Sequence, residues 1–187
     1  MISKKIFYIL LVCFIVFVSY IMYIHFTVGF SDPELVRYEY LPYSEIELEN
    51  TGIGPTFYSG QSFTPTVDHT IKKVVTWIAL QSSYEDATAT CRLYDVDMDY
   101  VFIAESDAVN ILSTEVTSVS FNFTSDYVFL EDHEYCFLIV PSYYMFVYHF
   151  DDYRYEDGDR TNLYVDTSHW TTSMMSDMPF EIWGYEL

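Results

Sequence analysis

The sequence predicts an all-β antiparallel sandwich preceded by one N-terminal transmembrane α-helix. Three observations support this prediction: an uncharged apolar segment at the N-terminus, an abundance of aromatic residues, and short strand-like segments that recur after the apolar one. Aromatic residues make up 20% of the chain, led by 19 Tyr and 15 Phe, and these residue types favour pleated strands. About 155 residues follow the apolar segment, which is the size of one domain with a proper core.

The apolar segment covers residues 6–30, which are 25 consecutive residues without a formal charge. At about 1.5 Å per residue, a helix of this length exceeds the ~30 Å hydrocarbon core of a bilayer. A cleaved signal peptide has a shorter apolar region and a small-residue cleavage site, whereas this segment stays bulky through Tyr20, Tyr23 and Phe26. We therefore expect an uncleaved signal anchor.

Charges on the two sides of this segment predict its orientation. Lys4 and Lys5 precede it, whereas Asp32 and Glu34 follow it. Because positive flanks stay in the cytoplasm, we expect residues 1–5 inside the cell, and the C-terminal domain outside the cell or on the exterior of a virion.

The exported part of the chain is strongly acidic. Residues 31–187 hold 6 basic and 28 acidic residues, which gives a formal charge of −22. Such a charge argues against nucleic acid as a partner, and it is also typical of a soluble, well-hydrated surface. Partners are therefore expected to be neutral, basic or bridged by cations.

Residues 31–56 combine Pro, Gly and acidic residues, which predicts a stalk or linker with one short strand near residues 44–48. The extracellular β-sandwich is then expected to span residues 57–187. In that range, short β-type segments recur between turn residues, which is typical of a sandwich. These segments are Phe57–Thr64, Ile71–Gln81, Ala87–Asp95, Val116–Phe123, Tyr127–Leu130, Tyr135–Val140, Met145–Phe150, Asn162–Val165 and Pro179–Tyr185.

Three of the segments alternate as a strand with one buried face requires. The faces expected to form the core are Val74, Thr76, Ile78 and Leu80, then Ala89, Cys91 and Leu93, then Val119, Phe121 and Phe123.

Several strand-like segments also follow one another in an order that can be compared with known domains. They are Gln61–Pro65 (QSFTP), Ile71–Val74, Cys91–Asp95, Val119–Phe123, Tyr127–Leu130, Tyr135–Val140, Trp170–Thr171 and Pro179–Gly184. Together they resemble the extracellular jelly-roll-like domains of microbial surface proteins, of the choice-of-anchor type, and of viral or phage appendages. The resemblance covers about residues 57–187 and implies a jelly-roll-like sandwich with an adhesive, carbohydrate-binding or structural role.

The usual catalytic signatures are missing. The sequence contains no nucleophile elbow, phosphate-binding loop, zincin helix or CxxC pair. The abundant carboxylates leave a glycosidase-like acid pair open, but no particular pair stands out. We therefore predict that the protein is not an enzyme.

Two acidic loops resemble calcium sites in sequence. Asp95, Asp97 and Asp99 alternate as in an EF-hand, but Tyr100 stands where that loop needs Gly, which excludes an EF-hand. The second loop offers many oxygen ligands for Ca²⁺, with a solvated acidic loop as the alternative. Its candidate ligands are Asp151, Asp152, Glu156, Asp157 and Asp159. No other cofactor is predicted.

Exposed aromatic side chains provide flat faces for sugar rings or for a protein partner. The predicted contact residues are Tyr143, Tyr144, Tyr148, Tyr153, Tyr155 and Trp170. The alternative is that some of them belong to the core of the sandwich, since tyrosine is common in strands.

Two further patterns concern export. Cys91 and Cys136 are the only cysteines after the apolar segment, so an oxidising compartment would allow a disulfide between them; free buried thiols are the alternative. Asn122 begins the only N-glycosylation sequon, although it lies within a predicted strand.

These observations lead to one functional hypothesis and two alternatives. The hypothesis is a non-enzymatic, membrane-anchored structural or adhesive component of a cell envelope or virion surface. The alternatives are a membrane-displayed carbohydrate-binding module and an anchored glycan-processing enzyme. The expected partners are the membrane, which the chain spans once, and either proteins of a surface assembly or glycans.

Overall fold

The computed structural model describes residues 38–40, 49–81, 87–151, 158–173 and 176–187. In these ranges the regular structure is β-strand, apart from one turn of 3-10 helix at Val165–Thr167. The transmembrane helix expected at residues 6–30 lies outside them, as does the short strand expected at residues 44–48. Among the residues that the structure describes, no helix is long and apolar enough to cross a membrane.

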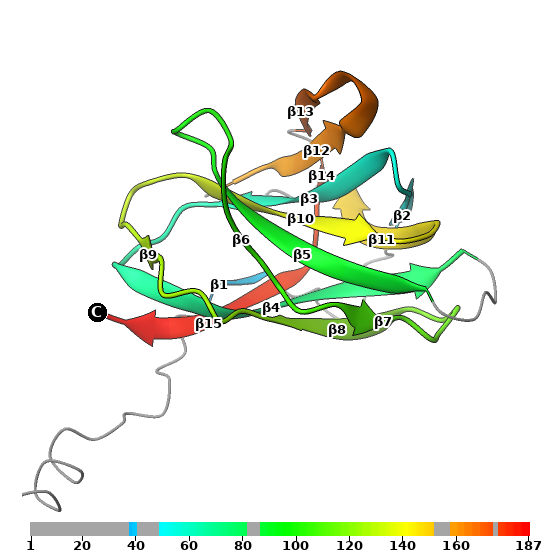
Figure 1. The fold of residues 1–187 in the computed structure, drawn as a ribbon, viewed down its shortest axis with the longest axis horizontal. Helices are drawn as coiled ribbons and strands as arrows, with labels where there is room; N and C mark the ends of the chain where they lie inside the picture. Colours follow the sequence, from blue (N-terminus) through cyan, green and yellow to red (C-terminus); the bar gives the residue numbers. More distant parts are fainter. Residues whose placement is uncertain (1–37, 41–48, 82–86, 152–157, 174–175) are drawn as a thin grey trace, which may run out of the picture. The chain divides into compact units, whose positions relative to one another are not determined.

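The described strands form two antiparallel sheets, which confirms the predicted all-β sandwich; Figure 1 shows β4, β8 and β15 in one layer and β3, β5 and β10 in the other. The first sheet contains β1 (Tyr38–Tyr40), β2 (Glu49–Ile53), β4 (His69–Leu80), β8 (Thr117–Asn122), β9 (Val128–Phe129), β11 (Met145–Asp151), β14 (Ser176–Asp177) and β15 (Phe180–Glu186). The second sheet contains β3 (Phe57–Phe63), β5 (Thr88–Asp95), β6 (Val101–Glu105), β7 (Val109–Asn110), β10 (Tyr135–Pro141), β12 (Arg160–Tyr164) and β13 (His169–Ser173). This architecture is compatible with a jelly-roll-like fold.

The core lies between the two sheets, on the faces that alternation predicts. Every residue of the three predicted faces is buried. The first face lies in β4, the second in β5, and the third in β8 together with Phe123, which follows that strand. Because successive side chains of a strand point to opposite faces, one face of each strand can supply this core while the other stays outside.

The central strand β10 buries both of its faces. It pairs with β3 on one edge and with β5 on the other. Tyr135, Phe137 and Ile139 face the core between the sheets. Cys136 and Leu138 point to the outer face, where they belong to a second, smaller apolar cluster.

Aromatic rings cover this outer cluster. The Trp170 ring of β13 stacks on Tyr100, with centroids 4.0 Å apart and planes at 14°, and it meets Tyr94 edge-on at 5.1 Å. Tyr100 has a positive φ of 60°, which costs a bulky residue conformational energy. Stacking on Trp170 offsets that cost and holds the turn between β5 and β6.

Some strands depart from the predicted ranges. β1 and β2 lie within the segment predicted as a stalk, yet they pair with β15 and β11. β6, β7 and β13 were not predicted, because each is short and none alternates cleanly between buried and exposed residues. The sheets therefore extend further at their edges than the hydrophobic pattern indicates.

Candidate contact sites

The first candidate site is the connection between β10 and β11, which carries Tyr143 and Tyr144. Their side chains are 37% and 54% exposed. The two rings are almost perpendicular, at 85°, with centroids 5.4 Å apart. Two large rings are thus presented side by side at the end of a paired strand, which limits the entropy lost when a partner binds.

Gly54 explains how Tyr144 is positioned. A Cβ added at Gly54 would lie 2.8 Å from both Cδ1 and Cε1 of the Tyr144 ring, closer than such atoms approach. The ring therefore lies against the backbone of Gly54, and only glycine leaves room for it. At Gly52, two residues earlier, an added Cβ would only reach ordinary contact with Phe146, at 3.9 Å.

The other predicted contact residues fall in different places. Tyr148 is half-buried in β11, opposite Asn50 of β2. Trp170 is half-buried in the outer aromatic cluster, so its ring supports the fold of the turn it covers. Tyr153 and Tyr155 lie outside the described residues.

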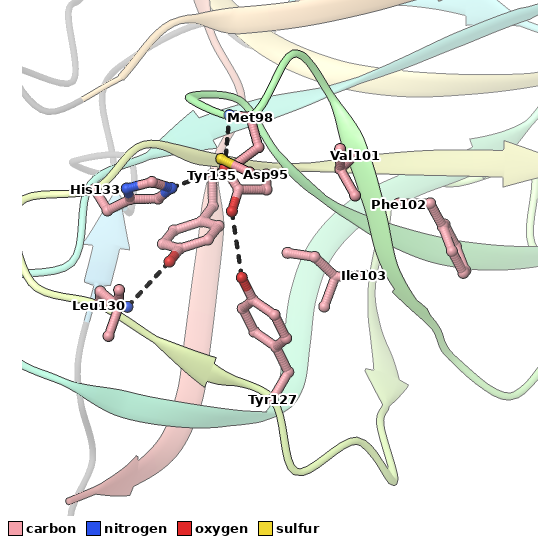
Figure 2. A pocket seen from close by; sticks show the side chains of 9 residues that line it. All are labelled: Asp95, Met98, Val101, Phe102, Ile103, Tyr127, Leu130, His133 and Tyr135. Carbon is pink, nitrogen blue, oxygen red and sulfur yellow. Dashed lines mark hydrogen bonds and ion pairs between the residues drawn. The ribbon is translucent and has the colours of Figure 1, made fainter.

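The second candidate site is a pocket of about 400 Å³, which the sequence did not predict. Figure 2 shows the Tyr127 hydroxyl pointing to Asp95, with His133 on one side and the β6 residues on the other. Its lining residues are Asp95, Met98, Val101, Phe102, Ile103, Tyr127, Leu130, His133 and Tyr135.

The walls of this pocket are apolar and open to solvent. Met98 is 61% exposed, Val101 53%, Phe102 52% and Leu130 49%. Scattered exposed apolar residues are ordinary on a protein surface, but a group of them around one concavity marks a binding site.

The floor of the pocket is a connected polar network centred on Asp95, which is only 4% exposed. The Asp95 carboxylate accepts hydrogen bonds from the Met98 backbone N–H at 2.9 Å and from the Tyr127 hydroxyl at 3.2 Å. It also lies 2.8 Å from Nε2 of His133. Tyr135 packs against this network: its ring meets the Tyr127 ring edge-on with centroids 6.3 Å apart, and its hydroxyl accepts the Leu130 N–H at 3.1 Å.

His133 is held between two carboxylates. Its Nε2 faces Asp95 at 2.8 Å and its Nδ1 faces Asp97 at 3.4 Å. Asp97 in turn accepts the Glu134 backbone N–H at 2.9 Å. Both ring nitrogens are therefore engaged, and the histidine links the turn after β5 to the turn before β10.

Burial changes the acidity of the two tyrosines in the floor. Burial raises the pKa of Tyr135 to about 12, and nearby Tyr127 and Asp95 add to this effect. The pKa of Tyr127 is also raised, first by burial and then by the negative charge of Asp95. Both hydroxyls consequently stay protonated to a higher pH than an ordinary tyrosine does.

The predicted calcium loop lies mostly outside the described residues, which exclude Asp152, Glu156 and Asp157. Asp151 ends β11. The backbone N–H of Asp159 donates to the Ser62 hydroxyl at 2.8 Å. Within the ranges that the structure describes, no three His, Cys, Asp or Glu side chains gather as metal ligands, and calcium binding stays a prediction.

Cys91 and Cys136 are free and buried. Cys91 faces the core between the sheets, whereas Cys136 faces the outer cluster. In the register of β5 and β10, Cys136 lies opposite Tyr94 and Cys91 opposite Ile139. Because the side chains point to opposite faces of one sheet, the structure has the free thiols and not the disulfide.

Asn122, which begins the sequon, is an exposed residue at the end of β8. It lies opposite Lys73 of β4. The side chain is thus on the outer face of the first sheet, and glycosylation there stays an open question of host chemistry.

Comparison with known proteins does not supply a function. No protein-family model matches the sequence, and no curated protein matches it. The function is therefore inferred from the fold and from the two contact sites.

Proposed function

We propose that the protein is a non-enzymatic, membrane-anchored structural or adhesive component of a cell envelope or virion surface. In this proposal its jelly-roll-like domain acts by contact. The observation that carries the proposal is the pair of exposed rings at Tyr143 and Tyr144, held at the end of β10 with Gly54 beneath one of them. Exposed Tyr is typical of partner-binding surfaces.

The sequence supports the anchor and its orientation. Residues 6–30 carry no formal charge, and two lysines precede them while acidic residues follow. With this orientation the acidic domain faces outward, where its charge favours solubility and selects against acidic partners.

The pocket supports binding in preference to catalysis. Its lining contains no Ser, Thr or Cys that could act as a nucleophile beside His133. Both nitrogens of His133 face carboxylates of this same chain, so the ring is oriented as a structural link and not toward a substrate.

A carbohydrate-binding module is the second candidate, and the exposed face of Tyr144 favours it. An aromatic ring that is 54% exposed can stack on a sugar ring. The two candidates differ in their ligand: the first requires a protein of the surface assembly, whereas the second requires a soluble glycan.

The test uses the full-length protein in its own membrane and three variants. Tyr144→Ala removes the ring, Gly54→Ala displaces it, and Gly52→Ala is the matched control, because a Cβ there meets only ordinary contacts. We expect the first two changes to reduce incorporation into the surface assembly about tenfold without unfolding the domain, and the control to have no effect. Unchanged incorporation of both variants would reject this contact surface.

A glycan-binding assay on the same proteins separates the two candidates. Binding of isolated glycans that depends on Tyr144 would replace the structural role with the carbohydrate-binding one. Cleavage of a glycan would instead identify an enzyme and overturn the proposal.

A further inference from the structure

Among the strands that the structure describes, β6 forms one edge of the second sheet, beside the pocket. Among the described strands it pairs with β5 alone, at the end of the second sheet. Two of its residues, Val101 and Phe102, are more than half exposed. An edge strand with exposed apolar side chains can accept another strand, and charges or bulges make such edges less receptive. β6 has one irregularity of this kind, where its register with β5 shifts between Phe102 and Ala104.

We propose that the β6 edge and its adjoining pocket bind an extended, Lys- or Arg-rich segment of a partner protein, which inserts an apolar side chain into the pocket. This inference rests on the proposed function, because it takes the domain to act by contact. It adds a second contact site and states the chemistry of the partner.

The shape of the site fits an added strand. In strand addition, main-chain hydrogen bonds along an edge provide affinity and a pocket for alternate side chains provides specificity. Val101, Phe102 and Ile103 of β6 all contribute to the pocket, so a strand on that edge would lie next to it. Its volume of about 400 Å³ lies in the range of ligand-binding pockets.

The site is also preorganised for binding. The network around Asp95 joins the turn after β5, the residue before β9 and the turn before β10. Walls that are already fixed reduce the conformational entropy lost on binding. Because the polar groups of the floor already have hydrogen-bond partners, the pocket favours an apolar side chain.

Charge determines the partner's chemistry. None of the nine lining residues is Lys or Arg. Lys72 of β4 is paired at 2.9 Å with Asp126, the residue before Tyr127. The acidic residues next to the lining residues in sequence are Asp97, Asp99, Asp126, Glu131, Asp132 and Glu134, of which Asp126 is paired with Lys72. An apolar pocket whose lining residues have acidic neighbours in sequence favours a segment whose apolar residues alternate with basic ones.

The same charge disfavours a second copy of this chain as the occupant. Residues 31–187 carry a formal charge of −22, so two domains repel each other. A sugar would also fit poorly, because the exposed walls offer Met98, Val101, Phe102 and Leu130 instead of hydrogen-bonding groups.

The test measures binding of dye-labelled heptapeptides to the full-length protein in detergent micelles by fluorescence anisotropy. The probe is Lys-Val-Lys-Phe-Lys-Val-Lys, in which alternate residues place the apolar side chains on one face of a strand. Two matched peptides serve as controls. Glu-Val-Glu-Phe-Glu-Val-Glu reverses the charge, and Lys-Ser-Lys-Ser-Lys-Ser-Lys removes the apolar side chains. We expect the first peptide to bind at least about tenfold more tightly than either control.

Two substitutions locate the site. Val101→Lys adds a positive charge at the mouth of the pocket and blocks the edge, and it is expected to weaken binding about tenfold or more. Leu112→Lys is the matched control, because Leu112 is 82% exposed and does not line this pocket; binding is expected to change less than twofold. Urea unfolding of both variants checks that the fold is retained.

The outcomes separate this inference from the proposed function. Tyr144→Ala should leave peptide binding unchanged, so assembly and peptide binding can fail independently. Equal binding of the serine or glutamate peptide, or full binding by the Val101→Lys protein, would overturn the inference. Self-association that Val101→Lys abolishes would also overturn it, because the occupant would then be a second copy.

Discussion

The polar floor of the pocket allows a quantitative prediction for Tyr135→Phe. The variant keeps the buried ring and removes the hydroxyl that accepts the Leu130 N–H at 3.1 Å. Leu130 is 49% exposed, so water can replace part of the hydrogen bonding that is lost. We expect the free energy of unfolding at pH 7 to fall by about 1–2 kcal/mol, toward the low end for a broken hydrogen-bond network.

The effect should depend on pH, with a sign fixed by the raised pKa. Tyrosine ionises near its ordinary value of 10 in the unfolded chain and at about 12 in the folded domain. Between those values the unfolded chain has lost the proton that the folded domain still holds, so stability falls as pH rises. For this residue the loss is about 1.4 kcal/mol at pH 11 and approaches at most about 2.7 kcal/mol above pH 12.

The phenylalanine variant has no proton to lose at this position. The difference in free energy of unfolding between the wild-type protein and Tyr135→Phe should therefore shrink from about 1–2 kcal/mol at pH 7 to near zero at pH 11. Urea unfolding of both proteins at pH 7, 9 and 11, followed by near-ultraviolet circular dichroism, measures this difference while the other tyrosines titrate equally in both. Tyr185→Phe, at a side chain that is 40% exposed, controls for loss of a hydroxyl at pH 7 and should change stability by less than about 0.5 kcal/mol. An equal difference at pH 7 and pH 11 would show that burial does not hold Tyr135 protonated.

Three other predictions address the fold, the cysteines and the topology. Gly60→Ala would place a Cβ 1.7 Å from a backbone carbonyl oxygen of β10 and should cost about 3 kcal/mol or more of stability, whereas Gly52→Ala should cost far less; thermal unfolding compares them. Burial raises the pKa of Cys91 and Cys136 well above the ordinary thiol value, so both should resist alkylation at pH 8 in the folded protein and react after unfolding without reductant, as mass spectrometry can show. Protease added to intact cells or particles should remove the acidic domain formed by residues 31–187, and digestion only after permeabilisation would mean the opposite orientation.

The interior of the sandwich could be predicted from sequence because its strands alternate. In β8 the buried residues Val119 and Phe121 alternate with exposed ones, which is the pattern of a strand with one buried face. In β10 all residues from Tyr135 to Ile139 are buried, so the sequence left the facing of Cys136 ambiguous. The cause is the outer aromatic cluster, which covers the second face of that strand.

The pocket could not be predicted in the same way. His133 and Asp95 are 38 residues apart in sequence and meet because β5 and β10 are neighbours. In the sequence, Asp95 ends a predicted strand and begins an EF-hand-like alternation that Tyr100 excludes, and neither pattern points to His133. A useful signal was present nevertheless: a histidine among acidic residues just before a strand, together with aspartates just after its neighbouring strand. Recognising it required knowledge of which strands pair.

The pairing of β4 with β15 has a consequence for how the chain folds. Their register joins Phe180 to Thr76 and Glu186 to His69, so an inner strand of the first sheet finds one of its partners more than a hundred residues later in the chain. Contacts of such long range slow folding, because a large loop must close before the pairing stabilises anything. During synthesis β4 is therefore exposed along that edge until β15 has been made. An export pathway that delivers the chain residue by residue would need to keep this edge from pairing with other chains in the meantime, and a translation product that stops before Phe180 should be a preferred substrate for proteases and chaperones.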